Sequence, residues 1–308
     1  KNTNIHKTKY INNIYNYKGK LIRDNSKIIF NSYYESAIKN YLKNDIENVY
    51  NFGFKVIDTE IGFNDFFTDV DYNKYLSYVN EISKLFNSRN IEPNGVCDGK
   101  TISMRLTIDA IFSRKNDFTN LYKLLFPYIE KNIYNSNIKL LDINAYKTCV
   151  TGLDKDVSSW IWHFDNHPNE FIKIMIYLTD VDEKSAPLQI IVDSNNNPVK
   201  MVSNRVSKEG WKEKEPYKYF HNQFNGNRLH ENDINKMIEN GYNIKEIYGK
   251  KGTIILFSEN IIHKATYPES KERLVVNTII SPSINKKDII ISKDLLSDSD
   301  KYKKWDDN

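Results

Sequence analysis

A series of short β-like segments occupies the chain from about residue 138 to residue 285. Each segment is rich in Ile, Val, Leu, Tyr or Thr, and most end in Gly, Asp, Asn, Ser or Pro, as strands bounded by turns do. Many short strands in series, with few helical patterns between them, favour a sandwich or a barrel. The segments are KLLDINAYKTCVTG, SSWIWHFD, FIKIMIYLTDV, APLQIIVDS, GTIILFSEN, IIHKAT and RLVVNTIISPS.

The N-terminal region, residues 1–138, is dominated by helical patterns instead. In residues 71–90, apolar side chains recur at steps of three and four, which predicts one apolar helix face. Residues 32–53 show a similar pattern and end on a glycine, a common helix stop. Residues 116–136 form a third such segment, and Pro127 is expected to kink or break it. We therefore expect a mainly helical region ahead of the β core.

A long polar segment, residues 195–250, interrupts the β-like series. It contains Trp211, His221 and Arg228, and its pattern predicts a helix around residues 232–240. Insertions of this length in a compact domain are uncommon and often functional, and this one could form a lid over a site. Residues 286–308 read as a polar C-terminal tail. The whole chain of 308 residues is expected to form a single domain.

Composition excludes several classes of protein. Hydrophobic residues make up 40% and charged residues 27%, as in ordinary globular proteins. The net charge of +4, from 44 basic and 40 acidic residues, is too small and dispersed to indicate nucleic acid. No apolar run is long enough to cross a membrane, so neither nucleic acid nor membrane is an expected partner.

The two cysteines, Cys97 and Cys149, are far apart and lack metal-binding or redox spacing. A disulfide framework is therefore not expected, and a reducing compartment, the cytoplasm, fits better. No signal-peptide pattern is present at the start. That absence has little weight, because the chain begins at Lys1 and not at a methionine.

The stretch WIWHFDNHP contains a histidine and an aspartate, His163 and Asp165, separated by one residue. On a strand, positions i and i+2 point to the same face, so the two side chains would project together. A His-x-Asp pair alone arises often by chance, and a capped loop is the simpler reading. However, His263 follows 98 residues after Asp165 in another β-like segment. Two imidazoles and one carboxylate form the facial triad of non-haem Fe(II) oxygenases.

Arg273 lies ten residues after His263, in RLVVNTIISPS, and would share a strand face with Asn277. A guanidinium directed into a barrel needs an anionic partner, and a dicarboxylate offers bidentate geometry. Asn277 could contact cosubstrate or substrate, or could be a satisfied buried amide. Lys173, in the apolar segment FIKIMIYL, is either a second cosubstrate contact or a side chain that reaches solvent.

These motifs resemble the Fe(II)/2-oxoglutarate-dependent oxygenases and, within them, the phytanoyl-CoA dioxygenase-like family. The residues that carry the resemblance are WHFD, followed by the apolar strand and LTDV, and then GTIILFSENIIHKATYPESKERLVVNTIISP. The resemblance covers roughly residues 140–285. One departure lies in SAPLQII, where the family more often has glycine. Ala186 can take that place if the turn does not require a positive φ.

The resemblance implies a double-stranded β-helix, a jelly-roll or cupin-like barrel, over residues 139–285, with the helical region packed on it. It also implies that His163, Asp165 and His263 are the Fe(II) ligands and the catalytic centre. Arg273 would bind the distal carboxylate of the cosubstrate 2-oxoglutarate, with Asn277 and Lys173 as further candidates.

The implied chemistry is hydroxylation of an unactivated C–H bond, with O2 as oxidant and 2-oxoglutarate converted to succinate and CO2. Related halogenases have a small residue in place of the carboxylate, so Asp165 favours hydroxylation or a similar C–H oxidation. We expect a small-molecule substrate, either a polar metabolite or a glycan- or nucleotide-linked precursor.

Residues with candidate substrate roles are Trp162, His167, Trp211 and His221, each with an ordinary alternative in packing or a solvated loop. His167 precedes a proline, which favours an extended or turn conformation, so a metal-ligand role is not expected. Two other functions stay open: a cupin-type metal enzyme that does not use 2-oxoglutarate, and a barrel that binds without catalysis.

Overall fold

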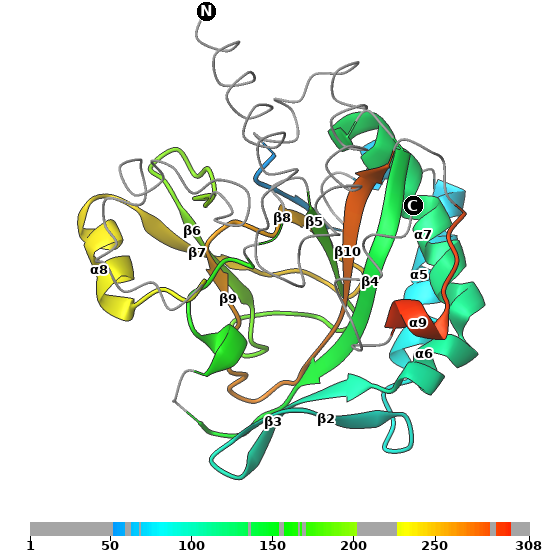
Figure 1. Ribbon diagram of the computed structural model, residues 1–308, viewed down its shortest axis with the longest axis horizontal. Coiled ribbons are helices and arrows are strands. Elements are labelled where there is room, and N and C mark those ends of the chain that lie inside the picture. Colours follow the sequence, from blue (N-terminus) through cyan, green and yellow to red (C-terminus); the bar gives the residue numbers. More distant parts are fainter. Residues whose placement is uncertain are drawn as a thin grey trace, which may run out of the picture.

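Two antiparallel β-sheets face each other in the structure, a computed structural model (Figure 1). The described residues are 52–58, 63–67, 69–134, 137–153, 157–165, 167, 171–201, 227–283 and 288–296. The large sheet has seven strands, in the spatial order β1 (Phe54–Ile57), β8 (Ile254–Ser258), β5 (Ile172–Tyr177), β10 (Arg273–Ser283), β4 (Asn137–Thr148), β3 (Lys100–Leu106) and β2 (Ile91–Cys97).

The small sheet has three strands, in the order β7 (Asn243–Ile247), β6 (Leu188–Val192) and β9 (His263–Lys264). Strands that are distant in the sequence lie side by side, because β8, β5, β10 and β4 are neighbours in the large sheet. This arrangement is the predicted double-stranded β-helix, or jelly roll.

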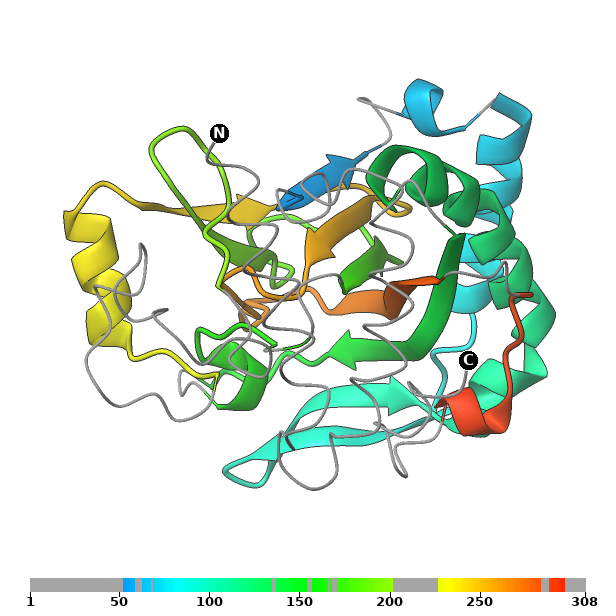
Figure 2. The ribbon, with the colours of Figure 1, turned by 45° about the horizontal axis from the view of Figure 1, so that its top comes forward.

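Helices cover the outer face of the large sheet, on the side away from the small sheet (Figures 1 and 2). One helix, α8, lies beside the small sheet instead. The helices are α4 (Phe63–Phe66), α5 (Asp69–Ser83), α6 (Ile108–Ser113), α7 (Lys115–Ile129), α8 (Glu231–Glu239) and α9 (Lys293–Leu296). A π-helical turn, Glu130–Tyr134, follows α7, and a 3-10 turn, Ser158–Trp160, precedes the WHFD motif.

Strand β5 shows how the sequence divides the two faces of the large sheet. Its isoleucines at alternate positions, beginning with Ile172, belong to the hydrophobic core beneath the helices. Met175 and Tyr177 belong to a second core between the two sheets. Because side chains alternate along a strand, Lys173 also faces the space between the sheets.

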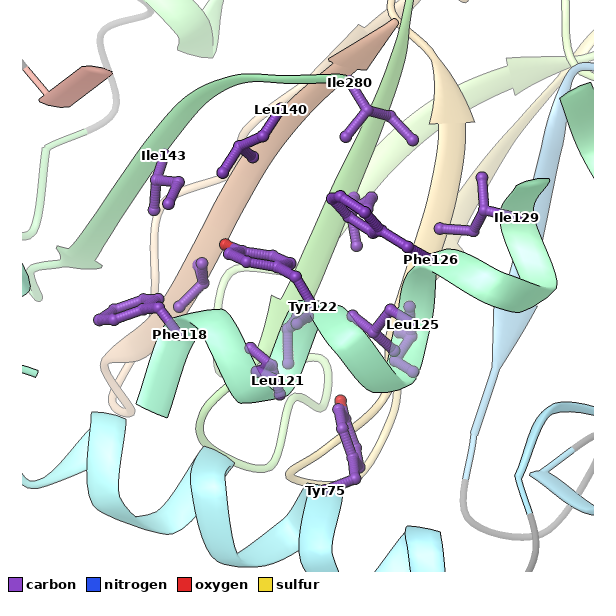
Figure 3. Packing of buried hydrophobic residues seen from close by; sticks show 14 of the residues in the cluster. Tyr75, Phe118, Leu121, Tyr122, Leu125, Phe126, Ile129, Leu140, Ile143 and Ile280 are labelled. Atoms are coloured by element: carbon purple, nitrogen blue, oxygen red, sulfur yellow. The ribbon is translucent and has the colours of Figure 1, made fainter. Parts of the chain in front are cut away.

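The outer core joins the helices to the large sheet. Tyr122 and Phe126 of α7 point toward the strands that carry Leu140 and Ile280 (Figure 3). These side chains are at most 9% exposed. The core also includes Leu296 of α9, so part of the predicted polar tail, residues 286–308, packs against the body of the protein.

Three helix predictions have different outcomes. The pattern at residues 71–90 corresponds to α5, which begins at Asp69 and ends at Ser83. A kink or a break was predicted at Pro127; the break is wrong, because α7 continues through this proline to Ile129, and the kink stays a prediction. Proline removes a single N–H donor near the helix end, and the next turn widens to a π-helix. The helix predicted at residues 32–53 lies outside the described residues.

Several strands lie where the sequence analysis did not expect them. Strands β1, β2 and β3 come from the region predicted to be mainly helical, and β7 lies within residues 195–250. Strands β1, β2 and β3 extend the large sheet beyond the expected residues 139–285. The segment SSWIWHFD is not a regular strand, since only His163 forms an isolated β-bridge. Asn232–Asn240 was predicted as a helix, and α8 occupies Glu231–Glu239.

The turn at Ala186 was expected to accept alanine in place of glycine if it did not require a positive φ. The φ of Ala186 is +59°, so the turn before β6 does require the left-handed conformation. The side chain is fully buried, and its Cβ gives this backbone a steric cost of about 1 to 2 kcal/mol that a glycine would avoid.

Both cysteines are free thiols. Within the described ranges, no helix has the length and apolar character needed to cross a bilayer.

Candidate metal centre

His163 continues the small sheet beyond its last regular strand. Its backbone N–H donates to the His263 carbonyl at 3.0 Å, and the His263 N–H donates to the His163 carbonyl at 2.8 Å. On the other side of His263, its register partner is Ile190 of β6. Residues that lie directly opposite each other across antiparallel strands project their side chains to the same face. The sheet therefore places the two imidazoles side by side.

The three predicted ligands converge in the structure. Asp165 Oδ1 lies 3.8 Å from His163 Nε2, and its Oδ2 lies 3.8 Å from His263 Nε2. All three ligand atoms lie within 4.8 Å of one another, and both histidines are buried. An octahedral ion with bonds of about 2.1 Å has ligand atoms about 3 Å apart on one face. Two nitrogens and one carboxylate at this spacing are compatible with an Fe(II) site.

Both histidines hold the tautomer that a metal requires. His163 Nδ1 lies 2.8 Å from the Ile161 carbonyl oxygen, and His263 Nδ1 lies 2.9 Å from the Ile261 carbonyl oxygen. A carbonyl only accepts hydrogen bonds, so each Nδ1 carries the proton and each Nε2 offers a lone pair. Burial lowers the pKa of both imidazoles, and the neutral form is the one that binds metal.

A largely buried lysine, with 14% of its side chain exposed, contacts the aspartate. Lys173 Nζ lies 2.5 Å from Asp165 Oδ2 and 3.5 Å from Glu259 Oε1. Burial alone would raise the pKa of Asp165, but Lys173 and the nearby histidines outweigh it and hold the pKa well below its usual value. The sequence analysis considered a cosubstrate contact or a solvent-reaching role for Lys173. In the structure, its ammonium group contacts the two carboxylates.

Glu259 is a residue of this centre that the sequence analysis missed. Its side chain is fully buried, and its Oε2 lies 2.5 Å from His167 Nδ1. Its backbone carbonyl also accepts the Asp165 N–H at 2.9 Å. The sequence did contain an indication of this role, because in FSEN the acidic Glu259 directly follows an apolar strand. His167, a candidate for substrate contact, thus contacts Glu259 and is not one of the three converging ligands.

Arg273 lies on the inner face of β10, and its residue is fully buried. Its Nε and Nη1 have no hydrogen-bond partner among the described residues. The Tyr177 hydroxyl is nearby: burial raises the pKa of Tyr177 to about 12, and Arg273 opposes that rise. A buried guanidinium with unpaired donors is costly, so this position fits an anionic ligand.

Asn277 faces the same interior, two residues along β10 from Val275. Its Nδ2 donates to the Tyr146 hydroxyl at 3.3 Å, whereas its Oδ1 is buried without a partner in the described part of the chain. One side of the amide is satisfied and the other is open to a ligand. Its predicted cosubstrate role stays a prediction.

Trp162 packs in a hydrophobic cluster with Phe164, Leu229 and Met237, and it is 1% exposed. It neighbours His163, and adjacent residues in extended backbone point to opposite faces, so the ring lies away from the three ligands. Its predicted substrate contact receives no support from this position. Trp211 and His221 lie outside the described residues, and their substrate roles stay predictions.

Residues 135–273 match the protein family described as phytanoyl-CoA dioxygenase (PhyH). The match begins before β4, includes all three converging ligands and ends on Arg273. The chain carries a PhyH family domain. This match confirms the resemblance inferred from the motifs and supports a 2-oxoglutarate-dependent enzyme. No curated protein sequence matches the chain.

Solved structures with a similar fold include three enzymes. The epimerase SnoN, in complex with Fe3+, alpha ketoglutarate and nogalamycin RO, is 11% identical with a TM-score of 0.43, over 79% of this chain and 85% of SnoN. HygX from Streptomyces hygroscopicus, with nickel and 2-oxoglutarate, is 15% identical with a TM-score of 0.39, over 78% and 88%. EctD from S. alaskensis, with 2-oxoglutarate and 5-hydroxyectoine, is 12% identical with a TM-score of 0.38, over 75% and 73%.

Proposed function

We propose that this PhyH domain protein is an Fe(II)- and 2-oxoglutarate-dependent oxygenase that hydroxylates an unactivated C–H bond. The substrate is a small polar metabolite or a glycan- or nucleotide-linked precursor. The observation that carries the proposal is the combination of the His163, Asp165 and His263 cluster with the buried Arg273, whose Nε and Nη1 have no partner among the described residues. The cytoplasm remains the expected compartment.

His163, Asp165 and His263 would hold the iron through Nε2, a carboxylate oxygen and Nε2. Bound together with 2-oxoglutarate and O2, Fe(II) supplies the oxidant for a C–H bond, a task that amino-acid side chains cannot perform. With three protein ligands only, the ion would keep coordination positions for cosubstrate and O2.

The chain itself positions these groups and excludes water. The carbonyls of Ile161 and Ile261 fix both imidazoles, and Lys173 holds one oxygen of Asp165. Arg273 would bind the distal carboxylate of 2-oxoglutarate with its free Nε and Nη1. The core between the sheets surrounds this inner face with apolar side chains, and a low local dielectric strengthens such a charged pair.

The test is an anaerobic titration of the purified protein with Fe(II) and 2-oxoglutarate. Chelation of the iron by the cosubstrate gives a metal-to-ligand charge-transfer band, which we expect for the wild-type protein. Arg273→Gln should bind iron normally but bind 2-oxoglutarate roughly 10- to 100-fold more weakly, as expected for loss of hydrogen bonds to a charged group. Arg105→Gln is the matched control, because Arg105 is a half-exposed arginine paired with Glu92.

Each alternative function gives a different result in this titration. A cupin-type enzyme that does not use 2-oxoglutarate would bind the metal without the band. A barrel without catalysis would give no succinate when it is exposed to air. Loss of iron from the Arg273→Gln protein, with the fold intact by circular dichroism, would show that the role of Arg273 is misassigned.

A further inference from the structure

Arg228 occupies the position next to His163 on the side away from His263. His163 forms isolated antiparallel bridges with both residues. The Leu229 N–H donates to the Trp162 carbonyl at 2.8 Å, and the Phe164 N–H donates to the Asn227 carbonyl at 3.2 Å. The backbone at Arg228 is therefore fixed against the backbone of the metal centre on both sides.

This pairing decides where the Arg228 side chain stands. Ile190, His263, His163 and Arg228 form one row of directly opposed residues across the small sheet and its extensions. Such residues share a face, with Cβ atoms of neighbours about 5 Å apart. Ile190 belongs to the core between the sheets, so the row faces inward. Arg228 thus projects on the same side as the two histidines.

The electrostatics agree with this placement. Burial lowers the pKa of Arg228, and the nearby Asp165 carboxylate opposes that effect. Burial is also the main reason for the low pKa of His163, and the Arg228 charge contributes to it. The guanidinium is therefore close enough to interact with two of the predicted iron ligands.

One guanidinium nitrogen of Arg228 is left unsatisfied by the described part of the chain. This atom, Nη1, is buried and makes no hydrogen bond within the described ranges. Asp165, the carboxylate whose charge acts on Arg228, accepts a hydrogen bond from Lys173 at its Oδ2. By contrast, Arg105 pairs with Glu92 at 2.8 Å and Arg114 pairs with Glu81 at 2.5 Å. A buried guanidinium donor that is left unpaired costs free energy, unless an anionic ligand completes it.

If the proposed function holds, the anionic ligand of Arg228 is not the cosubstrate. 2-Oxoglutarate has two carboxylates, of which one would bind the iron and the other Arg273 under that proposal. Arg228 is a second arginine on the inner face, beside the predicted iron ligand His163. We propose that Arg228 binds an anionic group of the substrate, a carboxylate or a phosphate.

This assignment narrows the substrate class from polar metabolites to acids and phosphate esters. It also indicates which part of the substrate is oxidised. Because Arg228 directly neighbours the ligand His163, the anionic group would be anchored close to the iron. The oxidised C–H bond should therefore lie only a few bonds from the acid or phosphate, not at the distant end of a long chain.

The experiment compares wild-type protein, Arg228→Gln and the charge-matched control Arg105→Gln, each loaded anaerobically with Fe(II) and 2-oxoglutarate. The probes are acetate, inorganic phosphate and the neutral trimethyl phosphate. Their binding is followed by the shift of the charge-transfer band. We expect acetate or phosphate to bind the wild-type and Arg105→Gln proteins, to bind Arg228→Gln at least 10-fold more weakly, and the neutral probe to leave the band unchanged. The preferred anion indicates whether the substrate is an acid or a phosphate ester.

The other outcomes are separable. If neither anion shifts the wild-type band, or if all three proteins bind it equally, Arg228 is not an anion site. If Arg228→Gln alone fails to form the band, Arg228 serves the cosubstrate and the inference is wrong. If the wild-type protein forms no band at all, the proposed function itself fails, and a phosphate titration followed by calorimetry still tests Arg228 directly.

Discussion

Lys173 places a positive charge in the space between the two sheets. Its neighbours on β5 are apolar, and its Nζ lies within 3.5 Å of carboxylate oxygens of Asp165 and Glu259. The two carboxylates outweigh burial and raise the pKa of Lys173. Without this ammonium group, two acidic side chains would lie beside each other with little solvent. Lys173 therefore holds Asp165 in place while the protein is free of metal.

Substitution of Lys173 by methionine should destabilise the metal-free protein by about 3 kcal/mol, because it leaves two neighbouring carboxylates without a counter-charge. Urea unfolding at neutral pH measures the change. Lys84→Met is the control, since its pair with Glu81 is on the surface and should contribute less than about 1 kcal/mol. Equal effects of the two substitutions would contradict the role given to Lys173, and adding Glu259→Gln should restore part of the loss.

At the scale of residues, the sequence predicted those residues of the candidate site that can be recognised from their separation along the chain. His163 and Asp165 were recognisable because they are two apart, and His263 and Arg273 because they follow in a strand pattern. Glu259 and Arg228 were not, because their roles depend on contacts across the fold: Glu259 is 92 positions from His167, and Arg228 pairs with His163. No local pattern encodes such a contact.

Helix α7 and strand β10 are joined by a polar contact inside an apolar core. The Tyr122 hydroxyl lies 2.5 Å from Thr278 Oγ1, and both residues are fully buried. Thr278 follows Asn277 and faces the helices, whereas Asn277 faces the site. The contact therefore connects the helical layer to the strand that carries the predicted cosubstrate residues.

Tyr122→Phe should lower the free energy of unfolding by about 1 to 3 kcal/mol, because it leaves the Thr278 hydroxyl buried and unpaired. The double change with Thr278→Val removes both polar groups at nearly constant shape and should recover most of that loss. Chemical denaturation of the three variants forms a double-mutant cycle. Additive losses would mean that the two hydroxyls do not interact.

At the scale of elements, apolar strands were predictable and polar ones were not. Strands β5, β6, β8 and β10 lie within segments predicted as strands, and β4 begins two residues before its predicted segment. Strand β2 has the sequence IEPNGVC and β7 has NIKEI, and both are edge strands. An edge strand is half solvated and tolerates proline and charges, so its sequence resembles a loop.

Across the whole molecule, the candidate site spans the gap between the sheets. His263 belongs to the small sheet and His163 extends it, whereas Lys173 and Arg273 belong to the large sheet. Iron and 2-oxoglutarate, as proposed, would therefore connect the two sheets through one chain of contacts. Composition could not predict this arrangement, because it depends on the order in which the strands pair.

Binding of Fe(II) and 2-oxoglutarate should therefore stabilise the entire domain against unfolding. A ligand that binds only the native state adds about 2.7 kcal/mol at 100 times its Kd. Anaerobic thermal unfolding should show one increase in Tm with Fe(II) and a further increase with 2-oxoglutarate, the second depending on the first. In the Arg273→Gln protein the first increase should remain, and the second should be smaller at the same 2-oxoglutarate concentration. Stabilisation by 2-oxoglutarate without metal would contradict a site that spans both sheets.

The two imidazoles have a further property in common. Each is held by the carbonyl two residues before it in the chain, so neither ring is free to flip or to exchange its tautomer. The cluster is thus a rigid template, with the directions of two lone pairs set by the backbone. Selection among divalent ions then depends on how well an ion's preferred geometry fits those fixed directions, and ions that favour an octahedral arrangement should fit best.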